Sequence, residues 1–316
     1  MDILLALALV LGLVCSSAYA EGKAIPQKPV IVGNWKRITA MPDLGKLAGP
    51  DPKRQHIVDH GLIQDAQGDW RLWACMRGTS VGRLLYGWKS PKLFAESWHP
   101  LGVVARAQRR FGEKIKDSGE ETLGAPFFLR EGDTWHCFYH SGGFRVMTST
   151  DGARYERATD WSGKGNRTDI PGGRDVMIMK HNGTFYSYAT VTTSDARRGY
   201  IVAATSPDLK RWKSHGIVCE ATDGENGRVS AESPFVLFKD GFFYLWRASS
   251  HDFKTYVYRS TDPLDFAPGT DDKLIDTVRL KAPEVIHHDG RWYITDLHDF
   301  QGLRMSELTW EADAGK

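Results

Sequence analysis

The sequence predicts an all-β protein, a five-bladed β-propeller built of four-stranded antiparallel blades. Two observations carry this prediction. A hairpin-like unit recurs five times along the 316 residues, and a second, polar motif recurs in step with it. Repeats of about 50 residues that each contain a β-hairpin are typical of propeller blades.

The clearest copy of the hairpin unit covers residues 231–246 and reads AESPFVLFKDGFFYLW. A polar residue opens it, a β-rich run follows, a glycine turn reverses the chain, and an aromatic strand returns, which predicts a tight hairpin. The spacings between the opening residues of the five copies are 65, 51, 57 and 49 residues. These opening residues are Asp59, Gly124, Asp175, Glu232 and Lys281.

The second motif reads Ser-x-Asp-x-x-x-aromatic and begins at Ser149, Ser206 and Ser260. Ser and Asp side chains hydrogen-bond nearby backbone in turns. Each copy is therefore expected to follow the third strand of its blade, with the aromatic residue starting the outer strand.

The chain begins with a predicted signal peptide, residues 1–20. Residues 3–14 are almost wholly apolar, and residues 18–20 read Ala-Tyr-Ala, a small-x-small cleavage pattern. The segment is too short to favour a membrane span. The expected location is therefore secreted or periplasmic.

Residues 21–55 are expected to form an N-terminal extension that precedes the propeller at 56–316. The first four blades are predicted at about 56–105, 123–165, 170–220 and 229–275. The fifth is one strand short, and a closed propeller leaves no edge unpaired. We expect a strand at 29–36 to complete it and close the ring.

Composition excludes several classes of function. The formal net charge is +2 and the basic residues are scattered, which argues against a nucleic-acid partner. No Cys-x-x-Cys or His-Glu-x-x-His pattern is present, so neither a metal site nor a cofactor is predicted. Trp88 and Trp161 fall outside the repeat and are candidate sugar platforms. The oligomeric state stays open.

The opening residues of the five hairpin units are the candidates for catalytic residues. Because the innermost strand of each propeller blade faces the axis, we expect all five to converge at the mouth of the central channel. Three of them are carboxylates. Glycosidic cleavage needs one carboxyl group to protonate the leaving oxygen and another to attack the sugar or activate water, and crowded acids raise the pKa of the proton donor.

Short motifs around these acids resemble those of a known group of enzymes. Residues 174–176 read Arg-Asp-Val, which resembles the Arg-Asp-Pro motif of family 32 glycoside hydrolases. Residues 232–234 read Glu-Ser-Pro, which resembles Glu-Cys-Pro of that family and Glu-Gly-Pro of family 43. Residues 59–61 read Asp-His-Gly where the usual first motif has Asp-Pro. The chain thus resembles the five-bladed propeller glycoside hydrolases of families 43 and 32 over about 56–310.

The resemblance implies a role for each acid. Glu232 would be the general acid, and Asp175 would position the sugar and tune the pKa of Glu232. Asp59 would be the base of an inverting mechanism or the nucleophile of a retaining one, and this choice stays open. The implied reaction is hydrolysis of plant or algal oligo- or polysaccharide, by exo-action on a pentose or furanoside.

Substrate-binding candidates lie next to the acids or at the ends of second strands: His60, Arg77, His140, Arg174, Arg247 and Lys281. Arginine forks suit carboxylate or sulfate groups, so Arg77, Arg145, Arg174 and Arg247 could recognise an acidic polysaccharide. A non-catalytic carbohydrate-binding propeller is the alternative. A protein-interaction scaffold is a third hypothesis, but it would not need an acidic pocket.

Overall fold

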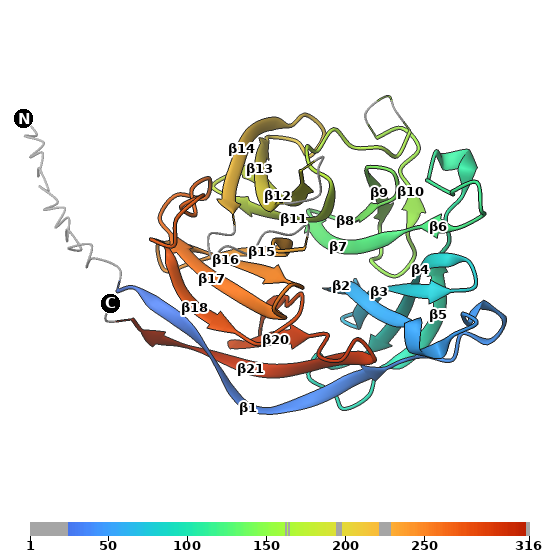
Figure 1. The fold of residues 1–316 in the computed structure, drawn as a ribbon, viewed down its shortest axis with the longest axis horizontal. Helices are drawn as coiled ribbons and strands as arrows, with labels where there is room; N and C mark the ends of the chain where they lie inside the picture. Colours follow the sequence, from blue (N-terminus) through green and yellow to red (C-terminus); the bar gives the residue numbers. More distant parts are fainter. Residues whose placement is uncertain (1–24, 162, 164, 194–197, 221–228, 314–316) are drawn as a thin grey trace, which may run out of the picture.

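The computed structural model describes residues 25–161, 163, 165–193, 198–220 and 229–313. Five antiparallel sheets are arranged as blades around a central axis (Figure 1). The predicted five-bladed β-propeller is therefore confirmed. The predicted signal peptide, residues 1–20, lies outside the described residues.

Each blade has four antiparallel strands. Blade one contains β2 (His56–Gln64), β3 (Trp70–Thr79), β4 (Gly82–Ser90) and β5 (His99–Ala105), with the short β6 (Glu121–Thr122) parallel to β4. Blade two contains β7 (Gly124–Glu131), β8 (Thr134–His140), β9 (Phe144–Ser149) and β10 (Glu156–Arg157). Blade three contains β11 (Arg174–His181), β12 (Thr184–Thr192), β13 (Gly199–Ser206) and β14 (Lys213–Glu220).

The last two blades follow the same pattern. Blade four contains β15 (Glu232–Lys239), β16 (Phe242–Ser249), β17 (Lys254–Ser260) and β18 (Leu274–Val278). Blade five contains β19 (Val285–His288), β20 (Arg291–Asp296), β21 (Gly302–Ala312) and β1 (Gln27–Ala40). In the described part of the chain the helical elements are three short 3-10 turns: η1 (Gly45–Leu47), η2 (Pro52–Arg54) and η3 (Arg109–Phe111).

Turn chemistry explains the inner hairpins. Asn182-Gly183, Asp240-Gly241 and Asp289-Gly290 all have positive φ at both residues. Such pairs form the turns whose twist matches two paired strands, and Asn-Gly and Asp-Gly are the sequences that favour them.

The polar motif lies where it was predicted, at the ends of the third strands β9, β13 and β17. The Ser149 hydroxyl accepts the Asp151 N–H at 3.2 Å, and the Ser260 hydroxyl accepts the Asp262 N–H at 3.0 Å. The motif therefore closes a local turn at the start of each outer connection.

The N-terminal strand β1 completes blade five. It pairs with β21 along its length, from Gln27 opposite Ala312 to Ala40 opposite Gly302. The two strands run side by side across one edge of the ring (Figure 1). The first and last described strands of the chain thus belong to one sheet.

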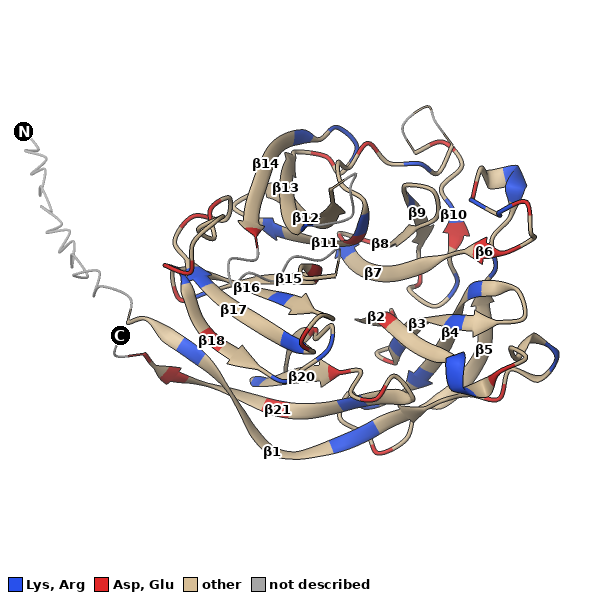
Figure 2. Ribbon diagram, viewed as in Figure 1, with Lys and Arg blue, Asp and Glu red and all other residues tan. Residues whose placement is uncertain are grey.

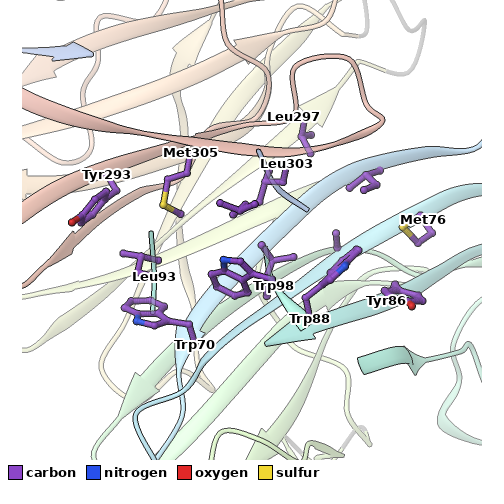
Figure 3. Close-up of a cluster of buried hydrophobic side chains, with 14 of the residues drawn as sticks. Trp70, Met76, Tyr86, Trp88, Leu93, Trp98, Tyr293, Leu297, Leu303 and Met305 are labelled. Atoms are coloured by element: carbon purple, nitrogen blue, oxygen red, sulfur yellow. The ribbon is translucent and has the colours of Figure 1, made fainter. Parts of the chain in front are cut away.

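The core lies between neighbouring blades. One cluster joins blade one to blade five through Trp70, Trp88, Trp98, Tyr293 and Met305 (Figure 3). Trp88 is 3% exposed and Trp161 is 8% exposed. Trp88 is therefore a core residue rather than a sugar platform. Trp161 is also largely buried, but it lines a pocket of about 950 Å³ between blades two and three, away from the hub.

Candidate active site

Every blade carries the same backbone irregularity where its inner strand approaches the axis. A non-glycine residue with positive φ lies at this point in all five blades: Asp59 (47°), Ala125 (47°), Asp175 (56°), Ser233 (43°) and Ala282 (46°). In the first four blades the strand register shifts by one residue here, which marks a β-bulge. The bulge turns the inner strand and aims these residues at the hub.

The bulges correct the predicted alignment of the opening residues. Asp59 and Asp175 occupy the bulge position, but Glu232 lies one residue before it. Glu232 is therefore equivalent to Val58 and Arg174 rather than to the two aspartates. An alignment based on the acidic residues alone does not reveal this offset of one residue.

The five inner strands enclose a small cavity of about 40 Å³. Its lining comes from every blade: Asp59, His60, Ala125, Pro126, Phe127, Asp175, Val176, Met177, Ser233, Pro234, Phe235, Ala282, Pro283 and Glu284. Acidic segments of β2, β11 and β15 lie toward the centre of the ring (Figure 2), although Glu232 on β15 is not among the residues that line the cavity. Residues 116 positions apart in the chain, Asp59 and Asp175, thus share one cavity.

Hydrogen bonds connect the three predicted catalytic acids. Ser233 Oγ donates to Asp59 Oδ1 at 3.1 Å, and the Ser233 backbone N–H donates to Asp175 Oδ2 at 3.4 Å. Arg174 Nη2 donates to Glu232 Oε1 at 2.6 Å, and Arg174 Nε lies 3.5 Å from Asp175 Oδ2. Ser233 and Arg174 therefore bridge all three acids into one network.

Burial and mutual repulsion change the acidity of this network. Burial, followed by the charges of Asp175 and Glu232, raises the pKa of Asp59 to about 7. Burial and the charge of Asp175 also raise the pKa of Glu232, while Arg174 opposes the rise. The site is thus set up to hold a proton near neutral pH, as a general acid requires.

Arg83 is a site residue that the sequence analysis missed. It lies at the start of β4, and its charge interacts with Asp59 and Asp175. A Cβ on Gly124 would lie 3.4 Å from Arg83 Nη1, so this glycine leaves room for the guanidinium. No repeat position distinguishes Arg83 from other strand arginines, so nothing in the sequence pointed to it.

Two of the predicted substrate-binding residues, Arg174 and His140, interact with the hub acids, whereas Arg77 and Lys281 lie against His56 and Phe300. Arg174 contacts Glu232 directly. His140 is the cross-strand partner of Gly124, and charges on Asp175, Arg83 and Arg174 affect its pKa, which burial lowers. Arg77 donates to His56 Nδ1 at 2.9 Å, and Lys281 Nζ lies 4.3 Å from the centre of the Phe300 ring.

Other predicted binders are structural. Arg247 is 1% exposed, donates to the Ser230 carbonyl and, at 3.1 Å, to the Tyr258 hydroxyl, so it is enclosed within its blade. Arg145 is buried and donates to Asn166 Oδ1 at 2.9 Å. The prediction that Arg247 reaches the rim is wrong, and so is the prediction that either arginine recognises carboxylate or sulfate there, because both side chains are buried and bonded within the protein.

His60 lines the hub cavity but points toward blade five. It is 5% exposed, and its Nε2 lies 2.8 Å from Thr295 Oγ1. Burial lowers its pKa to about 3, so the ring is neutral. We therefore assign His60 to the contact between blades one and five rather than to the pocket rim.

The described residues show neither a cluster of metal ligands nor a membrane-spanning helix. The described residues include no group of three or more His, Cys, Asp or Glu side chains placed to hold a metal ion. They also include no helix with the length and apolar character needed to cross a membrane.

This protein is similar to known proteins in its fold but not detectably in its sequence. No family model matches the sequence, and no curated protein matches it. Solved structures do match: a thermostable family-43 glycoside hydrolase has a TM-score of 0.59 at 15% identity, covering 85% of this chain and 93% of that chain. The GH43_1 enzyme from Xanthomonas citri complexed with xylotriose has a TM-score of 0.56 at 13% identity, covering 88% and 91%.

A Bombyx mori GH32 β-fructofuranosidase is similar as well, with a TM-score of 0.57 at 15% identity. The match covers 82% of this chain and 62% of that enzyme, so this chain spans less than two thirds of the length of the Bombyx protein. The fold is thus that of the family 43 and family 32 glycoside hydrolase propellers, as the motifs implied.

Proposed function

We propose that the protein is a glycoside hydrolase whose reaction centre is the acid network at the propeller hub. The observation that carries the proposal is the convergence of Asp59, Asp175 and Glu232, which Ser233 and Arg174 join by hydrogen bonds. The fold shared with family 43 and family 32 enzymes supports it. Fold alone does not fix function, so the site carries the argument.

The proposed chemistry divides between two carboxyl groups. Glu232 donates a proton to the leaving glycosidic oxygen, so its raised pKa suits it to that step. Asp59, when ionised, acts on the sugar from the other side, either directly or through water. Asp175 raises the pKa of both partners through its charge.

The substrate is proposed to be a plant or algal oligo- or polysaccharide, cleaved at a terminal pentose or furanoside. The solved structures with xylotriose and the β-fructofuranosidase fold support a pentose or furanose unit. The apolar segment at residues 3–14 supports action outside the cytoplasm, in a secreted or periplasmic protein.

The test is a Glu232→Gln variant assayed on a panel of chromogenic pentosides and hexosides. Removing a general acid lowers kcat by about 10²–10⁴-fold. Glu96→Gln, in an exposed loop, is the matched control and should retain full activity. Undiminished activity of Glu232→Gln on a glycoside that the parent cleaves refutes the assignment of the acid.

A non-catalytic carbohydrate-binding propeller is the second candidate. The bond from Arg174 to Glu232 favours it, because a guanidinium holds a carboxyl group in its ionised form and so opposes proton donation. Failure of the parent to cleave any glycoside in the panel, together with measurable oligosaccharide binding, would favour this candidate.

A further inference from the structure

A basic groove lies beside the acid hub, on blade one. It has a volume of about 850 Å³, which is large enough for more than one sugar ring. Arg54, His56, Arg77 and Arg83 line it. Basic segments are visible on the turn before β2 and on β4 (Figure 2).

Among the described residues, the arginines of this groove form no close ion pair with a carboxylate, although the charge of Arg83 interacts with Asp59, Asp175 and Glu120 at longer range. In the described part of the chain, no Asp or Glu oxygen lies within 4.0 Å of the charged nitrogens of Arg54, Arg77 or Arg83. Elsewhere, arginines such as Arg71 and Arg157 pair with carboxylates at 2.7 Å and 3.1 Å. Guanidinium groups that line one groove without a directly paired carboxylate can bind an external anion.

The two acids that line the groove are already engaged. Glu120 is paired with Lys116 at 2.7 Å. The Asp51 carboxylate accepts the Lys53 N–H at 3.0 Å. The groove therefore keeps a positive balance, although Glu120 also interacts with the charge of Arg83.

Phe300 extends the basic surface toward blade five. Its ring lies 4.3 Å from Lys281 Nζ, 5.9 Å from the Arg77 guanidinium carbon and 5.7 Å from the His56 ring. Lys281, too, has no carboxylate oxygen within 4.0 Å among the described residues. An aromatic face surrounded by cationic groups combines stacking for a sugar ring with attraction for its charge.

Arg83 connects the groove to the hub. It lines the groove, while its charge interacts with Asp59 and Asp175. A sugar unit bound in the groove would therefore neighbour the sugar unit whose glycosidic bond lies at the acids of the hub.

We propose that the groove is a subsite for an anionic sugar unit, so that the substrate is an acidic oligosaccharide bearing carboxylate or sulfate groups. This inference rests on the proposed function and names the substrate class of the same site. Carboxylate and sulfate share the oxyanion geometry that guanidinium forks bind.

The test is calorimetric binding to the full chain with Glu232→Gln, which prevents turnover. The probes are oligogalacturonides with their carboxyl-reduced counterparts, and sulfated galactan oligosaccharides with their desulfated counterparts. We expect one charged set to bind at least about ten-fold more tightly than its neutral counterpart, with the difference shrinking as salt is added.

Variants locate the effect. Arg77→Gln and Arg54→Gln should each remove most of the preference for the charged probe. Lys213→Gln, which removes the same charge from the exposed outer strand of blade three, should leave the preference intact. Equal binding of charged and neutral probes in both sets, or equal effects of Arg77→Gln and Lys213→Gln, overturns the inference.

The outcomes also separate this inference from the proposed function. If the parent binds charged oligosaccharides through the groove but cleaves none of them, the groove stands and the hydrolase assignment fails. If the parent cleaves neutral pentosides and ignores every charged probe, the hydrolase assignment stands and the groove inference fails.

Discussion

At the scale of one residue, Ser233 adjusts the protonation of the hub. Its hydroxyl donates to Asp59 and thereby lowers the pKa of that carboxyl group, against the stronger effects of burial and neighbouring acids. The proposed reaction needs one proton on the Asp59–Glu232 pair. Activity should therefore fall on the acidic side, where both groups are protonated, and above about pH 7, where the last proton leaves.

Replacing Ser233 with Ala should move the alkaline limb of the kcat/KM profile to higher pH. Loss of a hydrogen bond to an ionised carboxylate disfavours the ionised form, and we expect a displacement of roughly 0.5–1 pH unit. Ser214→Ala, on an exposed strand, is the control. An alkaline limb that stays in place or moves to lower pH contradicts the role given to Ser233.

Glu284 is a fourth acid of the hub, and the sequence analysis did not single it out. It lines the hub cavity, and burial raises its pKa to about 8, although a backbone hydrogen bond from Leu62 opposes the rise. Between its ordinary pKa of 4.5 and about 8, the folded protein binds this proton and the unfolded chain does not. The free energy of unfolding must therefore decrease as pH rises through this window.

The Glu284→Gln variant should remove that decrease. Thermal unfolding from pH 5 to pH 9 should show little difference from the parent at the acidic end. At the alkaline end the variant should have a melting temperature at least about 2 °C higher, because about 1 kcal/mol shifts the melting temperature of a large domain by about that much. Glu156→Gln, at an exposed position, should follow the parent throughout. Parallel curves for parent and Glu284→Gln would contradict the assignment.

The acids could be predicted from residue type and order, but aligning the acids with one another misplaced Glu232 by one residue. The return-strand aromatics Trp135, Phe185, Phe243 and Trp292 each follow the bulged residue of their blade by ten positions. Counting back from them would have placed Ser233, rather than Glu232, at the bulge. In blade one the interval from Asp59 to Trp70 is eleven, because the first hairpin has a longer turn.

At the scale of the element, the bulge holds non-glycine residues in a left-handed conformation. Ala125 and Ala282 have φ of 47° and 46°, a region that costs a residue with a Cβ roughly 1 kcal/mol. Five such residues lie around one hub, four of them at bulges, which indicates that this backbone geometry directs side chains at the axis, since strain of this kind concentrates at functional sites.

Ala282→Gly should therefore leave stability unchanged or raise it by up to about 1 kcal/mol, because glycine adopts positive φ without a steric penalty. The matched control is Ala74→Gly on β3, a buried residue whose φ is not positive. That variant should lose roughly 0.5–1 kcal/mol or more. Denaturant unfolding of the two variants measures the contrast, and equal destabilisation would refute the strain argument.

At the scale of the whole molecule, the number of blades followed from local signals: a turn, an aromatic strand and a polar motif repeated in phase. The convergence of the hub followed from topology once the blades were counted. The groove could not be predicted from the topology. Arg54 lies in a turn, Arg83 at the start of a strand and Phe300 in a distant loop, and no repeat links these three positions. Side-chain direction within a blade is set by packing that a one-dimensional pattern does not contain.

Ring closure depends on strand β1, which joins three blades. It completes blade five by pairing with β21. Toward its start, the Gln27 carbonyl accepts the Tyr244 hydroxyl of blade four at 3.0 Å. Toward its end, the buried Ile38 packs with the core of blade one, and its carbonyl accepts the Trp98 N–H at 3.1 Å.

Removing β1 should therefore destabilise the closed ring, because it removes contacts that join blade five to blades one and four. A chain that begins at residue 41 leaves β21 as an unpaired edge and removes Ile38 from its pocket, a loss of about 2–5 kcal/mol for that side chain alone. We expect its melting temperature to fall by at least about 5–10 °C relative to a chain that begins at residue 21. Ile38→Ala in the longer chain should give an intermediate fall, because it weakens the contact with blade one and leaves the strand paired. Equal melting temperatures of the two chains would show that blades one and four hold the ring closed without β1.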